Sequence, residues 1–175
     1  ITVEIWNDKC KKLPPNTIGE IVVTGSTVMA GYLGSEESGV YTDKKGNRWV
    51  MTGDLGYMDE DGFVFFTGRK KRMIIISGYN VYPADIENAV LQLPFVSEAC
   101  AVQGYIKNKP CVKLCVTLKE QMEHDDAINQ IQTYCKKNLA RFSCPRKIEI
   151  MESFPRTKMA KVDFMKLSDV YDPNK

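Results

Sequence analysis

A change of pattern near Arg69 divides this 175-residue sequence into two parts. Before it, short apolar runs separated by Gly and Asp predict strands joined by turns. The expected strands are 18–24, 27–32, 48–51 and 63–66, and residues 34–47 are expected to form a polar loop. Asp61-Gly62 predicts a hairpin turn, because glycine tolerates the positive φ that a tight turn demands. The first part is therefore expected to be rich in β-structure.

After Arg69 the pattern favours alternating strands and helices. Pro83 is placed to open a helix, since proline at the first helical position loses no hydrogen bond, and Asp85 and Glu87 complement the positive end of its dipole. Helical spacing of apolar residues predicts a second helix over 125–139. The expected strands are 73–76, 96–102, 111–118 and 147–151, with a turn at 77–80. The second part is expected to hold a three-stranded sheet with helices packed on it.

Three short motifs in fixed order carry the residues suited to chemistry. They are Thr52-Gly53-Asp54, the run from Gly68 to Gly78, and the run from Pro155 to Lys161. A carboxylate such as Asp54 offers two acceptor oxygens to two neighbouring hydroxyl groups, and basic side chains suit phosphate. Taken singly, each motif has a plainer interpretation as a turn or a solvated charge. Taken together, they indicate an enzyme that handles a nucleotide.

The order of these motifs resembles the C-terminal third of the acyl-adenylate-forming ligases, which include acyl-CoA synthetases, adenylation domains of peptide synthetases, and luciferases. The resemblance starts near Gly19-Glu20-Ile21, continues through Gly25 and Gly31-Tyr32, and runs to about Phe164. It implies an α+β fold in two domains. Residues 1–70 would be a small β-rich subdomain, a partial barrel, from the end of a large N-terminal domain. Residues 71–175 would be a compact, mobile C-terminal α+β lid.

The resemblance implies three residues for the first half-reaction, in which a carboxylate attacks the α-phosphate of ATP. Asp54 matches the acid that accepts hydrogen bonds from both ribose hydroxyls, and Arg69 matches the residue that contacts the ribose or the phosphate. Lys161 matches the lysine whose charge stabilises the displacement. Ala160 stands where the family usually has glycine, and its methyl group is expected to restrict how the turn presents Lys161.

A second set of residues is implied for the rotation of the lid and for the acceptor. Lys71 matches the hinge residue, two positions after the arginine. The loop of Gly78, Tyr79 and Asn80 matches the segment that approaches the adenylate and leaves a tunnel for the acceptor thiol. Ile75 stands where many members carry a lysine, so the role of that lysine is not carried over.

The function implied is that of an ATP-dependent acid–CoA ligase of the kind found in fatty acid metabolism. A carboxylate and ATP would give an acyl-adenylate and pyrophosphate, and coenzyme A would then give the thioester and AMP. The run from Gly78 to Pro83 favours coenzyme A, but an adenylation domain that loads a carrier protein is an alternative, and so is a non-catalytic α+β interaction module. The acyl pocket and the Mg²⁺ ligands are expected in an upstream N-terminal domain, its implied partner, without which the chain should be inactive.

Composition excludes several other classes. The formal charge of +2 gives no general attraction to nucleic acid, and the basic run 69–72 is short and lacks aromatic residues for stacking. Neither a run of 18 apolar residues nor a secretory leader is evident, which favours a cytoplasmic protein. The alternation at residues 1–5 suggests that the sequence opens inside a strand, as an excised piece would. The six cysteines lack metal-ligand spacing and are expected to be reduced.

Overall fold

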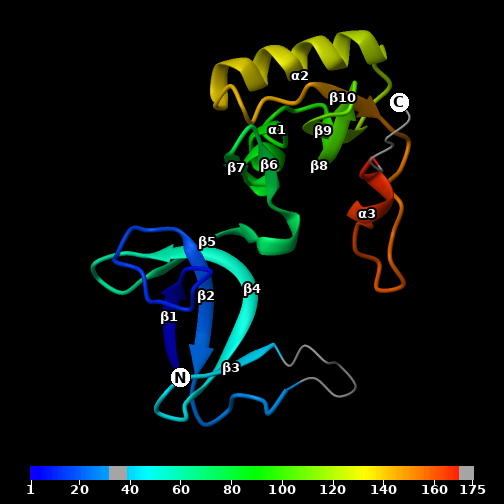
Figure 1. The fold of residues 1–175 in the computed structure, drawn as a ribbon. Coiled ribbons are helices and arrows are strands. Elements are labelled where there is room, and N and C mark those ends of the chain that lie inside the picture. Colours follow the sequence, from blue (N-terminus) through cyan, green and yellow to red (C-terminus); the bar gives the residue numbers. More distant parts are fainter. Residues whose placement is uncertain (32–38, 170–175) are drawn as a thin grey trace. The chain divides into compact units, whose positions relative to one another are not determined.

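The computed structural model describes residues 1–31 and 39–169, and the chain forms two compact units (Figure 1). The first unit, Ile1–Lys71, is called here the β-rich unit, and the second, Arg72–Lys175, the α+β unit. The 3-10 turn η1 (Lys70–Arg72) spans the point where one unit passes into the other along the chain. This mixture of sheets with few helices confirms the predicted α+β fold class.

The β-rich unit contains one antiparallel sheet built around its longest strand. Its strands are β1 (Thr2–Trp6), β2 (Gly19–Thr24), β3 (Val40–Thr42), β4 (Arg48–Met58) and β5 (Val64–Arg69). The order is β1-β2-β4-β3, and β5 also pairs with β4. A small core of Trp6, Val22 and Trp49 lies on this sheet, and the two tryptophan rings are 4.7 Å apart.

The α+β unit contains a three-stranded sheet, a separate hairpin and three helices. Its elements are β6 (Ile74–Ile76), β7 (Tyr79–Val81), α1 (Pro83–Val90), β8 (Val96–Ile106), β9 (Lys109–Leu118), α2 (His124–Asn138), β10 (Lys147–Ile150) and α3 (Phe164–Leu167). In the three-stranded sheet β9 lies in the middle, antiparallel to β8 and parallel to β10. Strands β6 and β7 form the hairpin.

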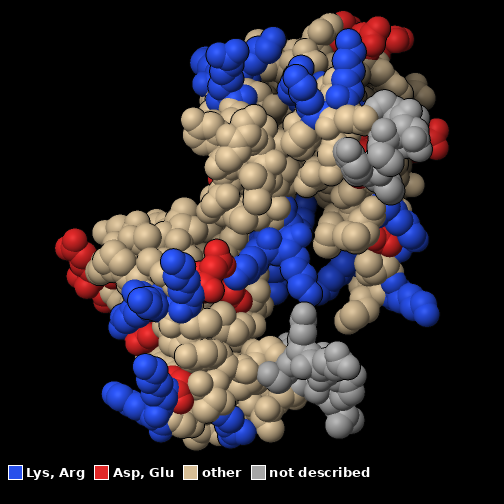
Figure 2. Space-filling view, viewed as in Figure 1, with Lys and Arg blue, Asp and Glu red and all other residues tan. Residues whose placement is uncertain are grey.

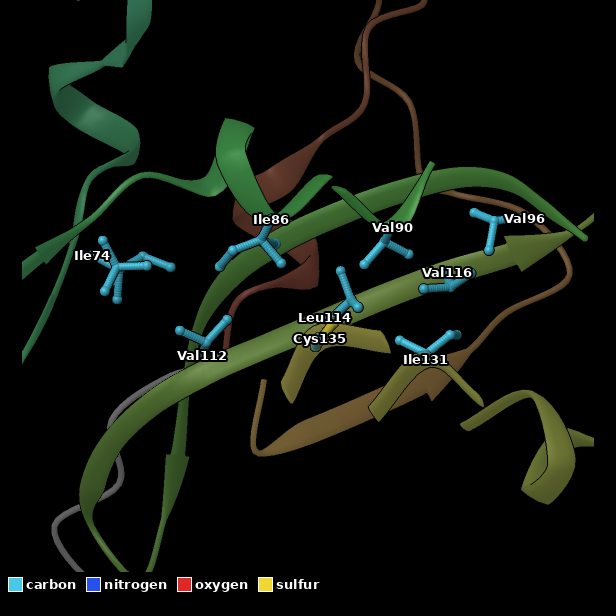
Figure 3. Close-up of a cluster of buried hydrophobic side chains, with 11 residues drawn as sticks. Ile74, Ile86, Val90, Val96, Val112, Leu114, Val116, Ile131 and Cys135 are labelled. Atoms are coloured by element: carbon cyan, nitrogen blue, oxygen red, sulfur yellow. The ribbon is translucent and has the colours of Figure 1, made fainter. Parts of the chain in front are cut away.

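Strand β9 is buried on both faces, which explains why most of its residues are apolar or cysteine, with Lys113 and Thr117 as buried polar exceptions. On one face Val112, Leu114 and Val116 point toward side chains of α1 and α2, as Figure 3 shows. On the other face a second cluster packs Cys115 against Phe154 and Leu167, among others. Alternate residues of β9 thus face two separate clusters.

The six cysteines are all free. Burial raises the pKa of the Cys100 thiol to about 12 and those of Cys115 and Cys135 to about 11. A thiol reacts as its thiolate, so these three side chains are inert at neutral pH. They serve as small apolar residues of the core.

Three sequence predictions in the β-rich unit are corrected by the structure. Residues 27–31 of the predicted strand 27–32 form a turn and irregular chain, because Val28 N–H bonds back to Gly25 O at 3.2 Å; residue 32 lies outside the described residues. The predicted loop 34–47 contains β3, while residues 34–38 lie outside the description. The predicted strand 48–51 continues to Met58, because β2 and β5 pair with its second half. The motif Thr52-Gly53-Asp54 is thus part of a strand.

The longest helix among the described residues, α2, has 15 residues. Within residues 1–31 and 39–169, no helix is both long enough and apolar enough to cross a bilayer.

Candidate functional site

Asp54 and Arg69 face each other across neighbouring strands of the β-rich unit. Asp54 lies on β4 and Arg69 at the end of β5, and the two are register partners. Arg69 Nε lies 2.7 Å from Asp54 Oδ1, and Arg69 Nη1 donates to Thr52 O at 3.4 Å. The carboxylate side chain is 26% exposed and the guanidinium side chain 59% exposed. The pair therefore places one acid and one base together at the surface of the sheet.

The backbone that carries Asp54 is held from both sides. Thr52 Oγ1 donates to Ile21 O at 2.6 Å and accepts from Asp54 N–H at 3.1 Å. Gly53 has a φ of +73°, which glycine adopts without strain. Its N–H donates to Glu20 Oε1 at 3.0 Å. The interpretation of Asp54 as the cap of a turn after the strand is therefore wrong.

Lys70 follows Arg69 and bonds to two carboxylates. Its Nζ lies 2.8 Å from Asp8 Oδ1 and 3.0 Å from Glu20 Oε2. The hydrogen bonds that Lys70 donates to Asp8 and then Glu20 raise the pKa of its ammonium, so it stays charged at neutral pH. Lys71, the predicted hinge residue, is exposed within η1 and is the last residue of the β-rich unit.

Arg72, the first residue of the α+β unit, is tied firmly into that unit. It forms an ion pair with Glu87 of α1, and its Nη2 donates to Ala101 O of β8 at 3.3 Å. Its guanidinium carbon also lies 5.4 Å from the centre of the Phe164 ring. These contacts restrain the chain immediately after Lys71.

The turn at Gly78 is a two-residue hairpin between β6 and β7. Ser77 and Gly78 have φ values of +50° and +85°, and Ile76 pairs with Tyr79. Positive φ at both central residues is the mark of a type I′ turn. Tyr79 and Asn80 are exposed residues of β7, so the predicted turn 77–80 is shorter than expected. The Tyr79 ring stacks on that of Phe142 at 4.6 Å.

Lys161 is exposed at the end of a tight loop between β10 and α3. Arg156 and Val162 form an isolated β-bridge across the base of this loop, and Thr157 N–H donates to Lys161 O at 2.8 Å. An ion pair between Arg156 and Glu98 fastens the loop to β8. Ala160 has a φ of +60°, a conformation that an alanine rarely adopts. The backbone at Lys161 is thus well defined although its side chain is free in solvent.

The structure brings together some of the predicted residues and separates others. Asp54 and Arg69 meet in the β-rich unit, and Gly78, Tyr79 and Asn80 share one hairpin of the α+β unit. The Lys161 loop precedes α3, and Figure 1 shows α3 and the β6–β7 hairpin at well-separated places of the α+β unit. Glu20 was not identified from the sequence as the hydrogen-bond partner of Gly53 and Lys70. The signal was an acid that directly precedes the apolar run Ile21-Val22-Val23.

The surface charges are mixed. On the face seen in Figure 2, Asp and Glu side chains lie beside Lys and Arg side chains on the β-rich unit. The described residues hold no cluster of three or more His, Cys, Asp or Glu side chains that could bind a metal ion.

Comparison with known proteins identifies the α+β unit. Residues 85–161 match the family model of the AMP-binding enzyme C-terminal domain, and Lys161 is the last residue matched. The chain belongs to the AMP-binding enzymes. The matched segment contains most of α1, the three-stranded sheet and α2, and it excludes Asp54, Arg69 and the Gly78 turn.

Longer AMP-binding enzymes resemble the chain over almost its whole length. A long-chain-fatty-acid–CoA ligase of Salmonella typhimurium is 36% identical over 169 residues, which is 95% of this chain and 29% of that protein. A peroxisomal benzoate–CoA ligase of Arabidopsis thaliana is 32% identical over 96% of this chain and 31% of its own length. The chain thus spans about three-tenths of the length of these relatives.

A solved structure shows the same fold. The o-succinylbenzoate CoA synthetase of Bacillus subtilis, in complex with its acyl-adenylate intermediate, superposes with a TM-score of 0.82 at 30% identity. The match covers 97% of this chain and 34% of that protein. The same enzyme has also been solved in complex with ATP and magnesium ion.

Proposed function

We propose that this chain is the C-terminal part of an ATP-dependent acid–CoA ligase. The observation that carries the proposal is the cross-strand pair of Asp54 and Arg69, in a chain whose similar proteins include acid–CoA ligases. The longer protein would convert a carboxylate and ATP into an acyl-adenylate and pyrophosphate. It would then transfer the acyl group to coenzyme A and release AMP.

In this proposal Asp54 binds the nucleotide ribose. Its carboxylate accepts hydrogen bonds from the two ribose hydroxyls, and a charged acceptor strengthens both bonds. Arg69 lies close enough to Asp54 to orient its carboxylate. The exposed part of the guanidinium is then available to the ribose or to a phosphate.

Lys161 supplies the cation of the first half-reaction. The attacking carboxylate and the α-phosphate are both negative, so a positive group between them stabilises the transition state. The defined loop around Lys161 supports this role, because a preorganised charge costs less to bring into place. The ATP-bound magnesium would be held by residues upstream of this chain.

The second half-reaction uses the Gly78 turn. An exposed type I′ turn offers backbone close to a ligand, and the added Cβ of a larger residue would meet no atom within 4 Å there, so its surroundings are open. Because the Gly78 turn and the Lys161 loop lie at separate places of the α+β unit, the unit would rotate to present each in turn. Lys71 is the proposed pivot, and the anchoring of Arg72 limits the bending to residues before it.

The remaining assignments follow the same proposal. The domain boundary lies near Lys71, with residues 1–70 and 71–175 on its two sides. Coenzyme A is the proposed acceptor, and a carrier protein is the alternative. The chain alone would be inactive without the upstream domain. The cytoplasm is the proposed location, and a peroxisomal relative shows that such enzymes are also found in organelles.

The test is acid-dependent exchange of labelled pyrophosphate into ATP, measured on the full-length protein with a panel of carboxylic acids. Lys161→Ala is expected to lower exchange by roughly a hundredfold to a thousandfold, the usual effect of losing one preorganised donor. Lys158→Ala, in the same exposed loop, is the matched control and should retain exchange. Thioester formation from supplied acyl-adenylate should survive Lys161→Ala.

Two results would contradict the proposal. Exchange that persists in Lys161→Ala would mean that another group supplies the cation. Absence of exchange with every acid, together with no AMP release when coenzyme A is added, would favour the interaction module.

A further inference from the structure

Glu20 is a buried carboxylate whose two oxygens hold the chain on either side of the Asp54–Arg69 pair. Only 6% of the residue is exposed. Its Oε1 accepts the N–H of Gly53 at 3.0 Å, and its Oε2 accepts the ammonium of Lys70 at 3.0 Å. Gly53 directly precedes Asp54, and Lys70 directly follows Arg69. One side chain therefore restrains both members of the pair through their neighbours.

Burial of this carboxylate carries a desolvation penalty that its partners must offset. A buried ionised acid is stable only when it is paired and hydrogen-bonded. Lys70 supplies the opposite charge and Gly53 supplies a backbone donor. A purely structural position would be filled with lower cost by an apolar residue, as at Val22 two positions along the same strand, which is completely buried.

Within this arrangement, the backbone conformation at Gly53 depends most on the bond to Glu20. Its φ of +73° and the open space around its Cα place few steric limits on the peptide between Thr52 and Gly53, whose C=O accepts only a longer bond from Arg69 Nη1, at 3.4 Å. The bond to Glu20 fixes that peptide, while Thr52 Oγ1 fixes the next N–H, that of Asp54. Without the carboxylate, the Asp54 side chain would no longer be directed at a single position beside Arg69.

We infer that Glu20 is a positioning residue for the nucleotide ribose, acting through Gly53 and Lys70 on Asp54 and Arg69. This inference rests on the proposed function, which assigns Asp54 to the two ribose hydroxyls. Glu20 itself touches no ligand in this arrangement. Its effect is to keep the carboxylate of Asp54 oriented so that both hydroxyls are bound together.

The ratio of activity with ATP to activity with 2′-deoxy-ATP measures how well Asp54 is oriented toward the second ribose hydroxyl. Removing the 2′-hydroxyl deletes one hydrogen bond to a charged acceptor, which corresponds to about a tenfold preference for ATP. Since both nucleotides are measured on the same enzyme sample, the ratio does not depend on what fraction of the sample is folded. A change in stability alone would leave it unchanged.

The experiment measures pyrophosphate exchange by the full-length protein with each nucleotide. Asp54→Ala is expected to abolish the preference. Glu20→Ala is expected to reduce it to about twofold, because an undirected carboxylate gains little from the second hydroxyl. Glu20→Gln should reduce it to about threefold, since one amide oxygen cannot accept from both Gly53 and Lys70. Asp8→Asn, which removes only the 88% exposed partner of Lys70, should keep the preference within about twofold of wild type.

The outcomes separate the inference from the function on which it rests. If Asp54→Ala keeps the preference for ATP, the ribose assignment itself is wrong. If Asp54→Ala loses the preference and both Glu20 variants keep it, Glu20 has no positioning role. Should Glu20→Ala fail to fold, Glu20→Gln decides alone, and an unchanged ratio overturns the inference. The inference also requires that Glu20→Ala causes no further loss of the ATP preference when Asp54 has already been replaced by alanine.

Discussion

The two units carry their proposed functional residues in different ways. In the β-rich unit, Asp54 and Arg69 lie on paired strands and are fixed by strand register. In the α+β unit, Lys161 and Gly78 lie on short turns outside the packed sheet. Residues on strands keep one geometry, whereas residues on turns can be presented to different surroundings when the unit moves as a body. The difference fits the proposed arrangement, in which a mobile unit serves a fixed nucleotide site.

The units also differ in where their apolar residues lie. The α+β unit has a large cluster on one face of its sheet and a second cluster on the other. The described core cluster of the β-rich unit has three buried residues, and β5 together with the turn before it exposes Phe63, Val64, Phe65 and Phe66. Each unit nevertheless contains a charge network with one buried member: Glu20 in the first unit, and Lys113, which bonds to the partly exposed Asp169, in the second.

The largest expected effect on stability distinguishes the packed sheet of the α+β unit from the exposed strand β5. Leu114 is fully buried between α1 and α2, so Leu114→Ala should lower the free energy of unfolding of the α+β unit by about 2–5 kcal/mol. Val64 on β5 is 41% exposed, and Val64→Ala should change stability by no more than about 0.5 kcal/mol. Urea unfolding followed by circular dichroism measures both. If the two variants lost equal stability, β5 would be covered in solution, and the contrast between the packed sheet and an exposed β5 would be wrong.

The α+β unit was more predictable from sequence than the β-rich unit, for a physical reason. Its helix α1 begins at Pro83 as predicted, and the alternation in β9 follows from side chains that face two separate cores. These signals are local, since periodicity and a capping residue are read within a few positions. The prediction of α2 was correct to within one residue at each end.

The proposed nucleotide site depends on pairing between strands that are distant in the sequence, which no local pattern reveals. Glycine and aspartate are unfavourable in strands, so Gly53 and Asp54 looked like a turn. Their strand conformation results from contacts with β2 and β5. A register shift between Leu55 and Gly56 then sets Asp54 opposite Arg69. The motifs named Asp54 and Arg69, but no sequence pattern indicated that the two side chains touch each other or that Glu20 supports them.

A smaller effect is expected at Asp169, whose network lies apart from the Lys161 loop and the Gly78 turn. Its oxygens lie 3.1 Å from Lys113 Nζ and 2.9 Å from Lys147 Nζ. Burial opposes ionisation, but the hydrogen bonds from Lys147 and Lys113 outweigh it and lower the pKa of Asp169. Asp169→Asn should therefore destabilise the unit by about 1–2 kcal/mol at pH 7.

The pH dependence of this loss identifies its origin. A carboxyl whose folded pKa is depressed stabilises the protein above its unfolded pKa of about 4, and this contribution disappears as pH falls through the folded value. The difference between wild type and Asp169→Asn should accordingly shrink below about pH 4. Glu152→Gln, an exposed acid of the same unit, is the control and should show no such trend. A difference that stays constant with pH would mean that shape rather than charge matters at Asp169.

The smallest expected effect concerns the turn that presents Lys161. Ala160 adopts a φ of +60°, where an alanine is strained by about 1 kcal/mol and a glycine is not. Glycine also loses more conformational entropy on folding, so Ala160→Gly should raise the free energy of unfolding by less than about 1 kcal/mol. In exchange assays on the full-length protein, Ala160→Gly should exchange pyrophosphate as fast as wild type, since the loop is already held by the Arg156–Val162 bridge. Lys161→Ala should cause the same loss of exchange with either residue at position 160. A large loss of exchange in Ala160→Gly would instead mean that the alanine stiffens the turn, and that the α+β unit, like the β-rich unit, depends on a fixed backbone to place its charged residue.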